Sequence, residues 1–174
     1  MALDLHTVSV CSYLQILPPL AGLIDKAEAH CREKGCGASV LTEASLAPDM
    51  WNFAKQVTSA VHHSAEAMRG LLGSGEFGPD LAPAPADFAA LRARAADAIG
   101  YLQGLEPETV NAKAGHDMAF VFGERRMPFS AEDFILTFSL PNFYFHATTA
   151  YAVLRNQGLA IGKMDFIGQP RLKV

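Results

Sequence analysis

The chain has 174 residues, of which 50% are hydrophobic and 18% are charged, enough to form a sizeable core. We therefore expect one domain over residues 1–174. The formal net charge is −4, and the 14 Lys and Arg residues form no run longer than Arg125-Arg126. Because this distribution offers no basic surface for phosphate backbones, we expect no nucleic-acid partner.

Residues 5–24 contain no Asp, Glu, Lys or Arg, and their length approaches that of a membrane helix. Polar side chains and the Pro18-Pro19 pair interrupt this stretch. The first basic residue is Lys26, so the stretch also lacks the basic start of a signal peptide. We therefore expect no membrane partner and a cytoplasmic location.

Three cysteines are present, Cys11, Cys31 and Cys36. Their number is odd, and the last two lack the spacing of a zinc knuckle or of a thioredoxin-type pair. We interpret all three as reduced, structural thiols.

Apolar residues that recur at three- and four-residue spacing predict four long helices. Capping residues and glycines mark their ends. The expected helices are 4–34, 49–72, 85–103 and 130–157. The first is expected to be bent or broken near Pro18-Pro19, and the second to be capped by Asp49. The loop after the first helix has room for a short helical turn at 40–44.

The connection at 73–85 is rich in Gly, Pro and Asp and has the pattern of neither a strand nor a helix. Because it is longer than the usual antiparallel link, we expect the next helix to run parallel to the one before it. Residues 117–129 predict a small β-hairpin with Gly123 and Glu124 at its turn. The tail after Gly158 is expected to be extended.

The last helix is the centre of the predicted fold. Ser130 suits its N-cap and Gly158 the position after its C-cap, while Pro141 is expected to kink it. Apolar side chains fall on every side, which is typical of a helix enclosed by its neighbours. Buried amides and imidazoles need hydrogen bonds, a metal or a ligand, so one polar strip is a candidate site. The strip contains Ser139, Asn142, His146 and Thr149.

On the second helix, apolar residues that recur every three or four positions, beginning with Trp51, Ala54 and Val57, define the core face. At about 100° per residue, His62 lies at the edge of that face and His63 lies nearly opposite to it. We therefore expect only His62 to face the interior.

The segment LPNFYFHATTAYAVLRNQGLAIGKMDFIG at 140–168 contains specific PNFYFH and TTAY blocks. It resembles the signature of a bacterial family, number nineteen-ninety-three in the domain-of-unknown-function series. The resemblance extends through residues 26–30, 46–50, 56–57 and 91–94. That family is similar to the DinB/YfiT-like superfamily of metalloenzymes.

The resemblance implies an all-α, DinB/YfiT-like four-helix bundle in up-down-down-up order, with the small hairpin before the last helix. In characterised relatives, one His of the second helix and an H-x-x-x-H pair of the fourth hold a divalent metal, and several relatives are thiol-dependent transferases or hydrolases. Here the pair reads Asn142-x-x-x-His146. Zinc or nickel would thus be held by His62 and His146. Because a neutral amide oxygen is a poor ligand for either ion, the balance favours no tightly bound metal.

Two functions remain open. In the first, the protein is an enzyme or former enzyme, in which His62 and His146 bind a metal between the second and fourth helices. Asn142, Ser139 and Thr149 would line a small-ligand site beside it. In the second, the protein is a non-catalytic bundle that forms a homodimer through exposed apolar or aromatic residues.

Overall fold

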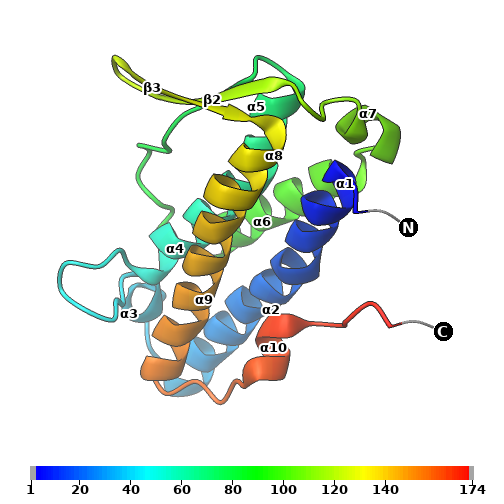
Figure 1. Ribbon diagram of the computed structural model, residues 1–174. Coiled ribbons are helices and arrows are strands. Elements are labelled where there is room, and N and C mark those ends of the chain that lie inside the picture. Colours follow the sequence, from blue (N-terminus) through cyan, green and yellow to red (C-terminus); the bar gives the residue numbers. More distant parts are fainter. Residues whose placement is uncertain (1–2, 173–174) are drawn as a thin grey trace.

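The structure is a computed structural model that describes residues 3–172, and helices dominate it (Figure 1). A small three-stranded sheet lies at one end of the long helices (Figure 1). The long helical stretches are α2 (Val10–Lys34), α4 (Phe53–Val61) continued by the π-helix η1 (His62–Glu66) and α5 (Ala67–Leu72), α6 (Phe88–Gln103), and α8 (Ala131–Asp133) continued by the π-helix η2 (Phe134–Ser139) and α9 (Leu140–Asn156). The short helices are α1 (Leu5–Val8), α3 (Ser39–Thr42), α7 (Pro107–Asn111) and α10 (Lys163–Ile167).

The core lies between the long helices, with α2 packed on α6 and α4 packed on α9. Four aromatic side chains at its centre are fully buried: Tyr13, Phe53, Phe134 and Phe143. Burying one such side chain stabilises the fold by about 1.5–3 kcal/mol. The pairing of α4 with α9 matters most for function, because the histidines lie on these two stretches.

Capping residues define most helix ends as the sequence predicts. Ser130 accepts a hydrogen bond from the Asp133 N–H (3.1 Å), and Gly158 follows the last helix with a φ of +85°, so both predicted ends are confirmed. The predicted Asp49 cap is wrong. Asn52 takes that role because its side chain accepts from the Lys55 N–H (2.9 Å).

The first helix breaks at Ser9, and α2 continues through Pro18 and Pro19, so the predicted break at the prolines is wrong. The Ser9 hydroxyl bonds to the Leu5 carbonyl (2.6 Å) and competes there with the helical backbone. By length and composition alone, the 30-residue stretch Leu5–Lys34 is apolar enough to cross a membrane, and 44% of its most apolar window is buried inside the protein.

The predicted hairpin is confirmed as β2 (Asp117–Phe122) and β3 (Arg125–Ser130), paired antiparallel with Phe122 opposite Arg125. The sheet has a further strand, β1 (Glu76–Phe77), which pairs parallel to β2. Sequence analysis missed it because two residues carry no periodicity. The tail also differs from the predicted extended form, since it contains α10.

The last helical stretch is not enclosed on every side, contrary to the prediction. Leu136, Tyr144 and Phe145 are 50%, 39% and 56% exposed. The remaining faces pack on α2, α4 and η1. Part of the surface of this stretch, which includes these three exposed side chains, therefore faces away from the bundle.

Candidate functional site

Two π-helices, η1 and η2, lie on the helical stretches that carry the predicted site residues. A π-helical turn is wider than an α-helical one, and one inserted residue turns the following side chains by about 100°. His63, however, is only the second residue of η1 and lies two helical turns after Gln56, so it shares the face from which Gln56 bonds to His146, and its ring lies 5.6 Å from the His146 ring between centroids. The prediction that only His62 faces the interior is wrong because Gln56 and Ser59 are also buried, so the buried surface of this stretch is wider than its apolar face.

His146 is buried and held in one orientation. Its Nδ1 lies 2.7 Å from the Gln56 side-chain oxygen, which only accepts hydrogen bonds, so Nδ1 carries the proton and donates it. The rings of Trp51 and His63 lie nearly parallel to the imidazole, at 15° and 20° and at centroid distances of 5.5 and 5.6 Å. This arrangement leaves Nε2 of His146 as a fixed hydrogen-bond acceptor.

The surroundings keep both stacked histidines neutral. Burial, followed by the charges of Lys55 and His62, lowers the pKa of His146 to about 4. Burial, followed by His146 and His62, lowers the pKa of His63 to about 3. His63 Nδ1 is buried without a hydrogen-bond partner. Near pH 7 the rings of His63 and His146 are therefore neutral imidazoles.

Next to these rings lies a pocket of about 260 Å³. Segment 78–82, part of the connection between α5 and α6, forms one wall. Aromatic and apolar side chains supply most of the lining, with few polar groups. The lining residues are Trp51, Ser59, His62, His63, Pro79, Asp80, Leu81, Phe120, Phe138 and Asn142.

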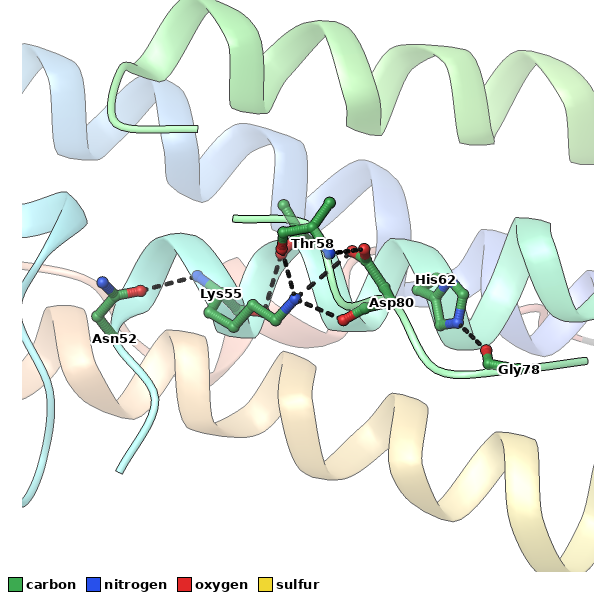
Figure 2. Close-up of polar contacts among 7 residues, drawn as sticks. Asn52, Lys55, Thr58, His62, Gly78 and Asp80 are labelled. Atoms are coloured by element: carbon green, nitrogen blue, oxygen red, sulfur yellow. Dashed lines mark hydrogen bonds and ion pairs between the residues drawn. The ribbon is translucent and has the colours of Figure 1, made fainter. Parts of the chain in front are cut away.

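Segment 78–82 is fastened to the helix beneath it, as Figure 2 shows. Lys55 Nζ donates to the carbonyl oxygens of Asp80 (2.9 Å) and Ala82 (3.0 Å), and lies 3.6 Å from the Asp80 carboxylate. His62 Nε2 donates to the Gly78 carbonyl (2.7 Å). Sequence analysis missed Lys55 as a site residue, because its partners are main-chain carbonyls that leave no pattern in the sequence.

The polar strip on the last helix is divided between the pocket and the helix backbone. Asn142 lines the pocket, and its Nδ2 donates to the Phe138 carbonyl (2.7 Å), which leaves its side-chain oxygen free. The Thr149 hydroxyl donates to the Phe145 carbonyl (2.7 Å).

Ser139 is fully buried between η1 and α2. Its hydroxyl donates to the His63 carbonyl (2.5 Å) and accepts from the Tyr13 hydroxyl (2.7 Å). Both hydrogen-bonding functions of Ser139 are thus used inside the protein, and the residue connects the two helices that carry the histidines.

The donor set does not fit a tight zinc or nickel site. In the part of the chain that the structure describes, no group of three or more His, Cys, Asp or Glu side chains is placed to hold a metal ion. The candidate donors that line the pocket are the imidazoles of His62 and His63, the Asp80 carboxylate and the Asn142 amide. Asp80 is paired with Lys55 and His62 Nε2 is bonded to the Gly78 carbonyl, while an amide oxygen suits neither ion.

Comparison with known proteins identifies the family of this chain. The family described as "Domain of unknown function (DUF1993)" matches residues 5–167, most of the chain. The chain belongs to the DUF1993 family. The DUF1993 chain is also similar to a DinB family member from Shewanella denitrificans, whose crystal structure superposes with a TM-score of 0.80. The two share 28% sequence identity over 98% of this chain and 95% of that one. No curated protein matches this DUF1993 chain.

The predicted DinB-like architecture is thus confirmed at the level of a mostly helical fold with a small sheet.

Proposed function

We propose that this DUF1993 chain is a DinB-like binding protein for a small, uncharged aromatic molecule that carries one hydrogen-bond donor. The observation that carries the proposal is the bond from Asn142 Nδ2 to the Phe138 carbonyl. It directs the amide nitrogen of this pocket-lining residue to the helix backbone and leaves the side-chain oxygen to accept a hydrogen bond from a hydroxyl or N–H group of a ligand.

The pocket supports this ligand class by its size and lining. A volume of about 260 Å³ suits a molecule of one ring. Trp51, His63 and Phe138 present ring faces or edges on which an aromatic ligand stacks. No permanently charged group other than Asp80 lines it, and Asp80 lies close to Lys55.

Phenol and anisole form a matched pair of probes, because phenol has a hydroxyl donor and anisole carries a methoxy group in its place. We expect phenol to bind with a Kd of about 1 mM, as befits so few atoms, and anisole to bind several-fold more weakly. NMR titration monitored at the ring of the pocket-lining His63 measures both. The variant Asn142→Leu should lose the preference for phenol, whereas Asn156→Leu, at the exposed end of the same helix, should keep it. Equal binding of the two probes would overturn the proposal.

Metal analysis of protein purified without an affinity tag tests for a zinc or nickel site held by His146. Under the small-molecule proposal we expect substoichiometric metal. One equivalent of zinc or nickel that disappears in His146→Ala would replace the small-molecule function with a metal-dependent one.

We infer that the four long helical stretches follow an up-down-down-up order within one domain. The colours in Figure 1 support this order, because α2 and α9 run away from the sheet, whereas α4 and α6 run toward it. The connection between α5 and α6, at 73–87, is long enough to return along the bundle.

A second candidate function is homodimerisation, and the exposed side chains of Leu136, Tyr144 and Phe145 favour it. Sedimentation at micromolar concentration tests this candidate. A dimer that dissociates in Phe145→Ser would support it, and a monomer would exclude it at that concentration.

A further inference from the structure

The C-terminal end of α2 brings two cysteines together. Gly35 adopts the left-handed conformation with a φ of +66°. Its N–H bonds to the Arg32 carbonyl (3.3 Å), and the Cys36 N–H bonds to the Cys31 carbonyl (2.9 Å). These two bonds define a Schellman motif, in which the side chains at the positions of Cys31 and Cys36 frequently touch. These two positions usually carry apolar residues, but here both carry thiols.

The second hydrogen bond limits the separation of the two cysteines. With standard bond lengths, an N···O distance of 2.9 Å holds the Cα atoms of Cys31 and Cys36 within about 6.8 Å of each other. That limit is the upper end of the range that disulfides span. Cys31 Sγ lies 3.6 Å from the Gly37 carbonyl oxygen, so its thiol is directed toward the turn that carries Cys36.

Cys31 and Cys36 both line one surface pocket of about 290 Å³. Cys31 is buried and Cys36 is half-buried, and both are free thiols. Burial, followed by the neighbouring Cys36 thiol, raises the pKa of Cys31 to about 11. Cys36 is therefore the thiol that an external reagent reaches first, and Cys31 is placed to react with it afterwards.

We propose that Cys31 and Cys36 form a reversible dithiol–disulfide pair that is oxidised by low-molecular-weight disulfides. The Cys36 thiolate attacks one sulfur of the external disulfide, which forms a mixed disulfide and releases one thiolate. The Cys31 sulfur then attacks the Cys36 sulfur, closes the Cys31–Cys36 bond and expels the second thiolate. The protons lost by the two cysteines appear on the two released thiols, so the pair is oxidised by two electrons while the external disulfide is reduced.

This assignment revises the interpretation of all three cysteines as reduced, structural thiols. Spacing alone excludes known zinc and thioredoxin patterns, but it does not reveal that a left-handed turn lies between Cys31 and Cys36. Cys11 stands apart, 3.7 Å from His6 Nδ1.

Glutathione disulfide is the probe, applied to the full chain, followed by alkylation of the remaining thiols and mass spectrometry. We expect the mass to fall by about 2 Da before alkylation, and only one of the three thiols to take up the alkylating reagent afterwards. A peptide that links Cys31 to Cys36 should appear and should vanish with dithiothreitol. A stable glutathione adduct on Cys36, or a disulfide between two chains, would overturn the proposal.

Two glycines of the same turn provide a matched control. Gly35→Ala strains the left-handed position, although a Cβ there meets nothing within 4 Å, and should slow ring closure several-fold. Gly37→Ala, where the nearest atom to the new Cβ is Ser39 Oγ at 3.9 Å, should close at the unaltered rate. Cys11→Ser should leave the reaction unchanged. Equal rates of disulfide closure in the two glycine variants would show that the left-handed turn does not bring the two cysteines together.

Discussion

The hydroxyl of Ser139 donates a hydrogen bond to the main-chain carbonyl of His63 across 2.5 Å, and so joins η2 to η1. The Tyr13 hydroxyl completes the chain from α2 by donating to Ser139 (2.7 Å). Three helical stretches are thus connected at the level of the candidate site, and the bond holds His63 in register with His146.

Replacing Ser139 by Ala should therefore destabilise the fold. The change leaves the Tyr13 hydroxyl without a partner in the core, and we expect a loss of about 1–3 kcal/mol in the free energy of unfolding. Chemical denaturation measures it. Thr137→Ala is the matched control, since that exposed hydroxyl bonds only to the Asp133 carbonyl of its own helix, and it should change stability little. In a Tyr13→Phe background the cost of Ser139→Ala should shrink, because Tyr13 no longer needs a partner.

Replacing Gln56 by Glu should raise the pKa of His146 from about 4, because a carboxylate beside Nδ1 favours the imidazolium. NMR titration of the His146 ring measures this pKa. Gln56→Met removes the acceptor without adding charge, and should instead release the fixed tautomer while the pKa stays low. A His146 pKa that is equal in Gln56→Glu and in the unaltered protein would contradict the role assigned to Gln56.

The free energy of unfolding should decrease as the pH is lowered below about 6.5. His63 and His146 have lower pKa values in the folded chain, about 3 and about 4, than in the unfolded chain, so the unfolded chain binds protons first. Their contribution is fully present above pH 6.5 and is lost as the pH falls toward the folded values. Each contributes a slope of up to about 1.4 kcal/mol per pH unit. Urea denaturation between pH 7 and pH 4.5 measures the slope.

The variant His63→Phe isolates one of these two histidines. It removes a buried nitrogen without a partner and leaves an aromatic ring near Phe77 and Phe138, so it should preserve or increase stability at pH 7. It should also make the pH slope shallower. A slope as steep as that of the unaltered chain would show that His63 does not titrate as described.

Replacing Lys55 by Met should loosen segment 78–82. The change removes two charge-assisted bonds to main-chain carbonyls while keeping the apolar stem. Hydrogen exchange of the amides of Asp80 to Ala82 should accelerate by about ten-fold or more. Lys26→Met, which removes an exposed ion pair with Asp165, should leave exchange in this segment unchanged.

Much of the local structure follows from the sequence. The Ser130 cap, the Gly158 end and the β2–β3 hairpin depend on residues near each other in the chain, and their patterns predict them. His146 and Asn142 were identified as site residues from their place on one strip, and both adjoin the pocket or its rings. The place of His63 in the histidine stack was missed, because apolar spacing marks only one face of the helical stretch, whereas the face that packs on His146 carries the polar residues Gln56 and His63.

The sequence by itself determined the family, the helical segments and which histidine and amide lie one turn apart, since these depend on short-range periodicity and on recognisable blocks of residues. Only the tertiary structure decided that Gln56 fixes the proton of His146, that Lys55 fastens segment 78–82, and that Ser139 connects two π segments. Each of these contacts joins residues 25 to 90 positions apart. Such pairings arise from how whole helices pack, and no local pattern in the chain specifies them.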